Sequence, residues 1–524
     1  MNEHTLKKAA QGARPSGSKQ KPPAGLMRTA IVMTIGILAP MLGVNIVNVA
    51  IKTIGVDLGI GVDLSQWLVT AYILCMGIAI PLSSWVVDRF PAKPVYLGAL
   101  AVFTVASLAA GLPCNFALLI VWRCVQGLAS GVGLQLVQTI LMREAGPGNR
   151  GRIMAIVGVP AVILPILGPT LGGLIVAYLP WRWVFLINVP LCAVAILLTA
   201  LLLPSLPVAD PHKRLDVPGN ILLAAGFCAA LYGISSLSGS GRAAGLVALA
   251  IGVVILALYV AYALRRSCSK SRHSGLDPES LPVSLRTEEK ILNQVQDDGI
   301  VKPTFVTTPT PSVVNVRLFR RPTFSSSVLL MMLYSFVSQG SLFVLALYFQ
   351  QSLGLSALMT GLMLIPQGLG MLVTRSWAGK ATDKHDPRLV ALIGIIPTLI
   401  GTLPFVFLGL GGLGGGFAGY VLLFAALFVR GLGLGIIMVP ITACVYTGLT
   451  PTQVSEGTTA QRIFQQIGGA VGTALMAIML ACGLGYGWVY ALCCLVLLIM
   501  LLPLRFMAGA KAATAPVAAN DSVV

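Results

Sequence analysis

The sequence predicts an all-α polytopic membrane protein with fourteen transmembrane helices and both termini in the cytoplasm. The first observation is composition: of 524 residues, 56% are hydrophobic and only 10% are charged, and the mean hydropathy is +0.89. A soluble domain has about a quarter charged residues. The second observation is length, because apolar stretches long enough to cross a bilayer core of about 30 Å recur along almost the whole chain. The third is the distribution of positive charge.

The apolar stretches give the fourteen spans in order. We expect two six-helix bundles, at 29–206 and 323–508, with two extra helices at 215–264 between them. The spans themselves are expected near 29–51, 66–86, 94–112, 115–142, 152–178, 183–204, 217–237, 243–264, 324–349, 357–377, 388–410, 417–447, 460–482 and 487–506.

Polar segments separate and flank these blocks. We expect cytoplasmic tails at 1–28 and 509–524, the first of them disordered because it is rich in Gly, Pro and Lys. Residues 265–322 are expected to form a cytoplasmic loop with a disordered insertion. In that segment charges cluster and apolar periodicity is absent, so it has little apolar surface to bury.

Positive charge orients the spans. Of the 35 Lys and Arg, the tails and alternate loops hold 30, counting those at helix ends. The opposite side holds Lys52, Arg182 and Arg242, while Arg123 and Arg430 lie within spans. This asymmetry is the positive-inside pattern, and it predicts that both termini are cytoplasmic. The formal charge of +18 then reflects topology and contact with anionic lipid, and we expect no nucleic-acid partner.

The two bundles carry matching features in the same order. The second helix of the first bundle ends at Asp88, and the matching helix of the second bundle ends at Asp383. Two helices later each bundle has an intramembrane arginine followed by glycines, Arg123 in the first and Arg430 in the second. Such an order indicates an internal duplication, which is common in transporters.

The segment "LPILGPTLGGLIVAYLPWRWVFLINVP" joins a Gly-Pro-x-x-Gly-Gly run to a Trp-Arg-Trp-x-Phe run. It resembles the EmrB/QacA-type drug:proton antiporters, the fourteen-helix branch of the major facilitator superfamily. The resemblance covers roughly 30–264 and 312–505 and implies the major facilitator fold and export by alternating access. The motif residues are Gly168, Pro169, Gly172 and Gly173, followed by Trp181, Arg182, Trp183 and Phe185.

The glycines of this motif have a physical meaning of their own. Small residues let two helix backbones approach closely, and Pro169 removes a hydrogen-bond donor and bends its helix. A bent, glycine-lined helix suits a moving interface between two bundles. A static packing seam is the alternative interpretation.

Asp88 and Arg89 lie at the cytoplasmic end of the second helix, and Asp383 lies at the matching position of the second bundle. The resemblance implies that this loop latches a gate, its acid and base bridging helix ends when the cytoplasmic side is closed. The match is partial, because the family's glycine is Ser84 here and its later Gly-Arg pair is Pro91-Ala92. An ordinary positive-inside loop is the alternative.

Arg123 is the sharpest single candidate. A charged side chain at the centre of a bilayer costs about 2.5–3.5 kcal/mol even on insertion scales, so it needs a cavity or a partner. Gln126 lies three residues on and shares its helix face. The resemblance makes both part of proton coupling, whereas a purely structural arginine satisfied by carbonyls is the alternative. Arg430 has the same two interpretations.

Polar and aromatic side chains within spans are candidates for a substrate cavity. A mostly apolar cavity with a few amides suits an amphiphilic, lipophilic or cationic small molecule. The same side chains equally serve as ordinary helix-packing material. The candidates are Asn45, Asn48, Gln135, Gln138, Gln339 and Tyr348.

One departure from the family bears on energy coupling. Many relatives carry an Asp in helix 1 where this chain has Gly43, and none of the 17 acidic residues falls in the middle of a predicted span. A rim acid such as Asp57 then carries the proton, or coupling uses another group, or export is not proton-coupled. We expect the proton gradient to be the energy source, with no cofactor.

Several functional classes are excluded by missing motifs. The sequence has no Gly-x-x-x-x-Gly-Lys-Ser/Thr phosphate loop, no His/Cys metal spacing and no nucleophile–His–acid set within the membrane, so we expect neither an enzyme nor an ATP-driven pump. The leading prediction is a multidrug or lipophilic-compound exporter of a bacterial inner membrane, with a periplasmic adaptor and outer-membrane channel as possible partners. The alternatives are a dedicated exporter of a metabolite, fatty acid or siderophore, and a non-transporting sensor or scaffold.

Overall fold

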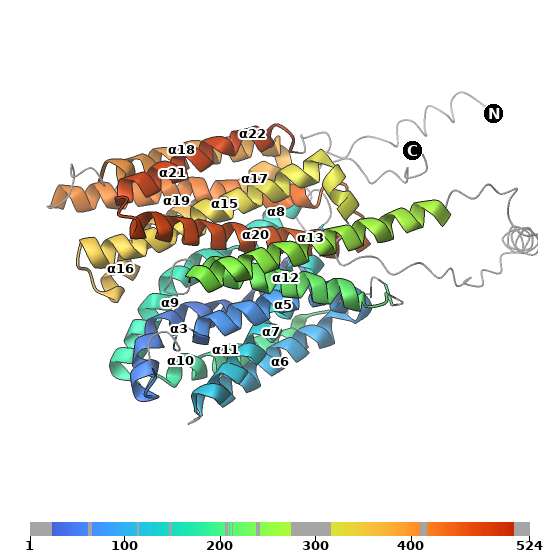
Figure 1. Cartoon of the computed structure of the whole chain (residues 1–524), viewed down its shortest axis with the longest axis horizontal. Helices are drawn as coiled ribbons and strands as arrows, with labels where there is room; N and C mark the ends of the chain where they lie inside the picture. The colour runs from blue at the N-terminus through green and yellow to red at the C-terminus, as the bar shows by residue number, and fades with distance from the viewer. Residues whose placement is uncertain are drawn as a thin grey trace, which may run out of the picture.

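The structure is a computed structural model of the whole chain. It describes residues 24–60, 65, 67–112, 115–145, 149–204, 208, 210–211, 213–236, 242–273, 316–408 and 417–507. All regular elements among these residues are helices. They form two bundles whose helices run along the long axis of the molecule (Figure 1).

The N-terminal bundle is the lower half of Figure 1. Its first predicted span is α2 and α3, which are separated only by Ile37, and α2 begins within the segment predicted to be a tail. The helices are α2 (Ala24–Gly36), α3 (Leu38–Asp57), α5 (Trp67–Arg89), α6 (Ala92–Gly111), α7 (Phe116–Ala145), α8 (Arg150–Val157), α9 (Val159–Tyr178), α10 (Trp183–Leu186) and α11 (Asn188–Leu202).

The C-terminal bundle is the upper half and repeats this arrangement. Thr450 begins its α20 with a capping box, in which Thr450 and Gln453 satisfy each other's backbone amides. The helices are η2 (Val316–Arg320), α15 (Pro322–Leu347), η3 (Tyr348–Ser352), α16 (Ala357–Met363), α17 (Ile365–Lys384), α18 (Pro387–Leu408), α19 (Phe417–Val445), α20 (Pro451–Ala481), α21 (Tyr486–Ile499) and α22 (Leu501–Leu504).

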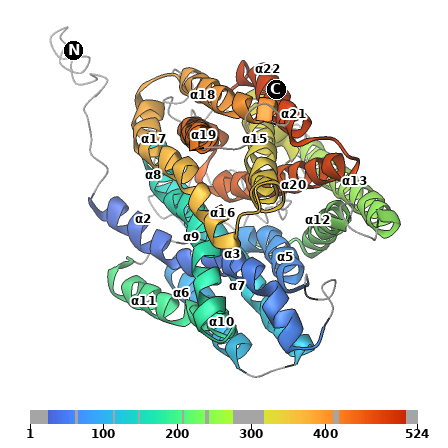
Figure 2. The ribbon, with the colours of Figure 1, turned by 90° about the vertical axis from the view of Figure 1, so that its left-hand side faces the viewer.

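Two further helices, α12 (Val217–Ser236) and α13 (Arg242–His273), pack against each other on the flank of the molecule. The α12 helix contacts α5 of one bundle and α20 of the other (Figure 2). The α13 helix continues to His273, into the segment predicted to be a loop, and residues 274–315 of that segment lie outside the described residues.

Twelve of the described helices are long and apolar enough to cross a membrane. They match twelve of the fourteen predicted spans. The other two, 152–178 and 357–377, are helical but broken, the first at Gly158 between α8 and α9 and the second at Leu364 between α16 and α17. Arg375, Lys380 and Lys384 further lower the hydropathy of α17.

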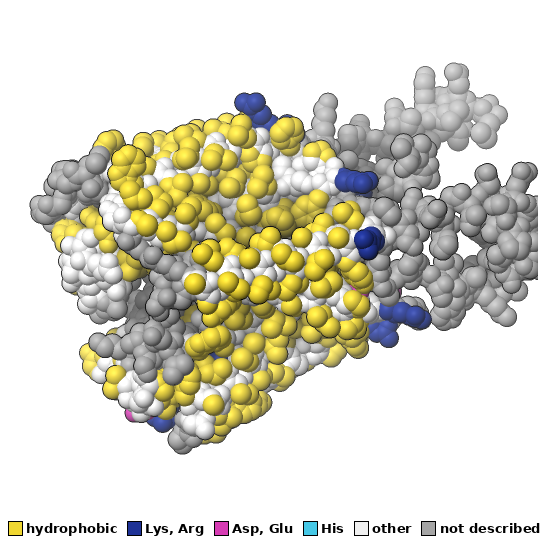
Figure 3. Space-filling view, in the orientation of Figure 1, with side chains coloured by type: hydrophobic (Ala, Val, Ile, Leu, Met, Phe, Trp, Pro, Cys, Tyr) yellow, Lys and Arg dark blue, Asp and Glu magenta, His cyan; other side chains and the backbone are white. Residues whose placement is uncertain are grey.

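The outer surface has the composition that a bilayer requires. Apolar side chains cover the flank, and Lys and Arg gather mainly toward one end (Figure 3). We call this the basic end. Arg89, Arg143, Arg150 and Lys213 lie there, close to the junction of the two bundles.

The bundles share a core at the basic end and separate elsewhere. One cluster of buried apolar side chains joins Ile140 and Ile153 of the N-terminal bundle to Val439 and Ile463 of the C-terminal bundle. Two other clusters belong to one bundle each. The bundle interface is therefore packed most continuously at the basic end.

Close helix contacts within a bundle give a first prediction. A Cβ at Gly431 of α19 would overlap with the Gln367 carbonyl of α17, whereas a Cβ at Gly98 of α6 would meet no atom within 4 Å. We expect Gly431→Ala to lower stability by about 1–3 kcal/mol through overpacking. Thermal unfolding in detergent measures this effect. Gly98→Ala is the matched control, and equal midpoints for the two variants would contradict the prediction.

Candidate functional site

Asp88 links the two bundles at the basic end. Its side chain is 1% exposed and forms ion pairs with Arg143 of α7 and, at 2.6 Å, with Lys213. Ser455 of α20, in the C-terminal bundle, donates its hydroxyl to Asp88 Oδ2 at 2.6 Å. A buried carboxylate with cationic partners is costly to separate from them, because the remaining charges would lose their compensation. Both cations lie on the N-terminal side, and the bond from Ser455 carries Asp88 across the bundle junction, so we call this contact a latch.

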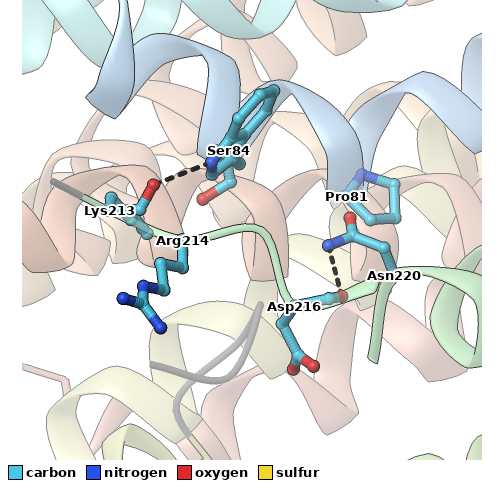
Figure 4. Close-up of a pocket in the computed structure, with 7 residues that line it drawn as sticks. Pro81, Ser84, Lys213, Arg214, Asp216 and Asn220 are labelled. Carbon is cyan, nitrogen blue, oxygen red and sulfur yellow. Dashed lines mark hydrogen bonds between the residues drawn. The ribbon is translucent and has the colours of Figure 1, made fainter. Parts of the chain in front are cut away.

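The segment that leads from the N-terminal bundle to α12 is fixed against the same latch. Trp85 Nε1 donates to the Lys213 carbonyl at 3.0 Å, and Arg89 donates to the Pro211 carbonyl at 2.8 Å. Figure 4 shows the small pocket that this segment forms with α5 and the start of α12. The two residues of the predicted acid–base pair thus make different contacts: Asp88 bonds to the other bundle, and Arg89 bonds to the segment that leads to α12.

Asp383 forms a second latch with different chemistry. Its two carboxylate oxygens accept the backbone N–H groups of Gly151 at 2.9 Å and Arg152 at 3.2 Å. These amides belong to the first turn of α8, where N–H groups have no helical acceptor and the helix dipole favours an anion. A Cβ at Gly151 would lie 2.6 Å from the Gly379 carbonyl, so the approach needs glycine. A carboxylate of the C-terminal bundle therefore caps a helix of the N-terminal bundle.

The two latches are related by the internal repeat. The end of α5 meets α20, and the end of α17, its counterpart, meets α8. Each bundle thus contributes one carboxylate and receives one. The sequence predicted both acids as gate residues, and the structure brings both to the bundle junction.

Gln135 and Gln138 of α7 were predicted to line a substrate cavity. In the structure they bond across the junction, and their role in a substrate cavity stays a prediction. Gln135 donates to Thr459 at 3.0 Å, and Gln138 donates to Tyr446 at 2.9 Å and to Gln461 at 3.0 Å. In this conformation the two glutamines reinforce the latches.

Arg123 lies in the N-terminal bundle and is 1% exposed. Its Nε donates to the Leu68 carbonyl at 2.7 Å, its Nη1 donates to Gln126 at 3.0 Å, and its guanidinium stacks over the Tyr72 ring at 4.4 Å. Gln126 in turn donates to Ser107 at 2.8 Å. The predicted face shared by Arg123 and Gln126 is confirmed, and the chain from α5 through α7 to α6 is continuous.

Arg430 occupies the equivalent place in the C-terminal bundle and is fully buried. It donates to Gln367 of α17 at 3.2 Å and to the Ser341 hydroxyl of α15. Tyr72 precedes Asp88 by the same number of residues as Gln367 precedes Asp383, so the two positions correspond in the two bundles. One bundle therefore satisfies its arginine with an aromatic ring, and the other uses an amide.

Arg375 of α17 is a buried arginine that the sequence reasoning missed. It is 2% exposed and reaches the N-terminal bundle, where its Nε donates to the Ala155 carbonyl at 3.1 Å. Its position inside the predicted span 357–377 was the available signal. The sorting of positive charge counted it with the helix ends.

The glycine-rich motif lies on α9. Gly168 and Gly172 are buried, which fits a close helix contact, and α9 packs against α3 and α16. A Cβ at Gly173 would meet no atom within 4 Å, so close packing does not explain this glycine in the present conformation. The side chain of Pro169 lies outside the described residues.

Of the other predicted cavity residues, Tyr348 and Gln339 make separate contacts. Tyr348 lies in η3 against Tyr486, with ring centroids 5.2 Å apart, and Gln339 is an exposed residue of α15 whose Cγ faces Gly469. The side chains of Asn45 and Asn48 lie outside the described residues. A role in substrate binding stays a prediction for these four.

Gly43 of α3, the position of the absent helix 1 carboxylate, faces α11. A Cβ there would lie 3.4 Å from Asn188 Nδ2, and Asn188 Oδ1 is buried without a hydrogen-bond partner. The side-chain amide of Asn188 thus lies where it would donate a hydrogen bond to a carboxylate at position 43. Asp57 lies at the other end of α3, where Trp181 donates to it at 2.7 Å and Arg182 lies 3.7 Å away.

No group of three or more His, Cys, Asp or Glu side chains within the described ranges could hold a metal ion.

The environment of Asp383 predicts how closure depends on pH. Burial raises the pKa of Asp383 to about 6 and outweighs the lowering by the amides of Gly151 and Arg152. Separation of the bundles would return the carboxyl to water and to a pKa of about 3.9. The closed conformation then binds the proton more tightly, so a fall in pH through about 6 should favour closure.

Spin labels on exposed Phe90 and Leu389 would measure the distance across the basic end. We expect the closed fraction to rise as the pH falls from about 7.5 to about 5 in the wild type. Asp383→Asn, which cannot ionise, should lose this response. The same pH response in wild type and variant would refute the assignment to Asp383.

Comparison with known proteins agrees with this geometry. A sequence model of the Major Facilitator Superfamily matches residues 33–473 and 327–521. The Multidrug resistance protein B homolog of Mycobacterium tuberculosis is 31% identical over 460 residues, covering 87% of this chain and 76% of that protein. The lincomycin resistance protein LmrB of Listeria monocytogenes is 26% identical over 420 residues, covering 80% of this chain and 79% of that protein.

Among solved structures, the human organic anion transporter MFSD10 has a TM-score of 0.61 at 15% identity, covering 93% of this chain and 100% of that one. A likeness at this identity concerns the fold alone. The family match over most of the chain, the curated relatives and the paired helix bundles together show that the chain is a membrane transporter of the Major Facilitator Superfamily.

Proposed function

We propose that the chain is a proton-driven exporter of lipophilic organic compounds, multidrug in range, that works by alternating access in a bacterial inner membrane. The observation that carries this proposal is the pair of reciprocal latches at the basic end, formed by Asp88 with Ser455 and by Asp383 with the start of α8. Two bundles joined by breakable polar contacts at one end suit a transporter that rocks about its centre. The names of the curated relatives support drug export.

The proposed topology has fourteen membrane helices, with α8–α9 and α16–α17 added to the twelve long apolar ones. The basic end is then the cytoplasmic side, because Lys and Arg mark that side of membrane proteins. Both latches close the cytoplasmic entrance in this conformation. A periplasmic adaptor and an outer-membrane channel are proposed as partners on the resemblance alone.

Proton coupling is proposed without a helix 1 carboxylate. Asp383 supports it, because its proton affinity differs between a buried and a hydrated environment and its latch opens and closes with the gate. Arg123 and Gln126 are proposed to transmit movement from α5 to α6 through their hydrogen bonds. A dedicated exporter of a single metabolite, fatty acid or siderophore is the second candidate, and a biosynthetic gene cluster beside the gene would favour it.

Expression in an efflux-deficient bacterium tests export. We expect the wild type to raise resistance to several lipophilic compounds, and Arg123→Ala to reduce resistance to the level of cells without the transporter, because the α5–α7–α6 network loses its centre. Arg505→Ala, which removes an exposed arginine, is the matched control.

Inverted membrane vesicles test the energy source. Transport should stop when the pH gradient is collapsed, and transport that continues would refute proton coupling. An Arg123→Ala variant that inserts normally and keeps full resistance would refute the role of Arg123.

A further inference from the structure

Arg375 is a positive charge that one bundle inserts into the other. It belongs to α17, but its Nε donates to the Ala155 carbonyl of α8 at 3.1 Å. Its Nη2 lies 3.4 Å from the sulfur of Met438 on α19. A thioether sulfur is only a weak hydrogen-bond acceptor. Its Nη1 is buried and has no hydrogen-bond partner. Only one of the three guanidinium nitrogens thus has an oxygen acceptor.

The place of Arg375 is built by the break in the opposing helix. Any side chain at Gly158 would overlap with the guanidinium, so the glycine makes the room that Arg375 occupies. Pro160 follows at the start of α9 and has no N–H for the helical ladder. The break therefore combines an absent side chain with an available carbonyl at Ala155, and together they hold an arginine from the other bundle.

This charge has no carboxylate to compensate it. Among the described residues, ion pairs join Asp88 to Arg143 and Lys213, and Asp57 to Arg182. Arg123, Arg375 and Arg430 take part in none of them. Each also has a buried nitrogen without a partner, which is Nη2, Nη1 and Nε respectively. The three arginines are therefore buried positive charges without a paired carboxylate, an expensive condition in a membrane protein.

Of these three arginines, Arg375 is the one that bridges the bundles. Its oxygen acceptor belongs to the N-terminal bundle, so separation of the bundles at α8 would carry the Ala155 carbonyl away. The guanidinium would then keep only the Met438 sulfur among its present partners. Tyr334, whose hydroxyl lies within electrostatic range of both Arg375 and Arg430, is a neutral neighbour on α15.

We propose that Arg375 binds the acidic group of the cargo, so that the exported compounds are lipophilic organic anions. This inference rests on the proposed export function and specifies its substrate class. A carboxylate or phenolate can accept two parallel N–H bonds from a guanidinium, and it would replace the lost Ala155 carbonyl when the bundles separate. The cargo then supplies the counter-charge that Arg375 lacks.

The same argument disfavours the lipophilic cation that the sequence alone allowed. A cation in the bundle interface would lie near uncompensated positive charge, and repulsion between like charges is strong where water is scarce. An apolar body with one acidic group satisfies both the apolar interface and the guanidinium.

A pair of probes with the same ring system separates charge from lipophilicity. The purified full chain in lipid nanodiscs is titrated with radiolabelled naphthoate and, separately, with naphthylmethylammonium. We expect the wild type to bind naphthoate, and Arg375→Gln to weaken that binding about tenfold or more, the loss expected for one charge-assisted bidentate contact. Arg375→Lys should retain part of the affinity, because it keeps the charge but loses the planar fork.

Two further variants serve as controls for the Arg375→Gln result. Gly158→Ala should also weaken naphthoate binding, because its Cβ displaces the guanidinium without removing any charge. It carries the test if Arg375→Gln does not elute as a single species. Arg505→Gln, which removes an exposed arginine, should bind naphthoate as the wild type does.

The outcomes separate the anion site from the export function. A wild type that does not bind naphthoate, unchanged naphthoate binding in both Arg375→Gln and Gly158→Ala, or an equal loss for naphthoate and the ammonium probe would overturn the anion site. Binding that depends on Arg375, in a chain that transports neither probe in vesicles, would uphold the site and refute export.

Discussion

A charge inside a membrane protein must find its partner within the protein, because the surrounding lipid offers none. The arrangement of the two bundles follows largely from how this requirement is met. Asp88 is paired with cations, Asp383 with backbone amides, and Arg123 with a carbonyl, an amide and an aromatic ring. Most of these partners come from a different helix, so satisfying each charge also fixes how the helices pack.

The charges at the junction and the apolar core act together. The apolar core cluster that joins both bundles includes Tyr446. The Tyr446 hydroxyl bonds to Gln138 and Gln461, and its backbone carbonyl accepts a hydrogen bond from Arg150. Polar bonds are directional and apolar contacts are not, so the polar set defines one alignment of a surface that would otherwise slide. The latches thus define which alignment of the two bundles is the closed conformation, and they add less to the free energy that holds the bundles together.

Much of the fold follows from the sequence, because the length of an apolar stretch and the placement of Lys and Arg respond directly to the bilayer. Contacts within one helix were also predictable, as the bond between Arg123 and Gln126 illustrates. Contacts between bundles were not. Gln135 and Gln138 bond across the junction, and Arg375 inserts beside Gly158, through tertiary packing that leaves no regular spacing in the chain.

The two latches will respond differently to change over evolutionary time. The bonds to Asp88 depend on the side chains of Arg143, Lys213 and Ser455, so each of those positions is constrained in identity. Asp383 instead takes the amide of Arg152, which every residue except proline provides. Position 152 can therefore change without loss of this amide bond, although the change removes a positive charge that lowers the pKa of Asp383, so the two halves keep matching latches under unequal mutational constraint.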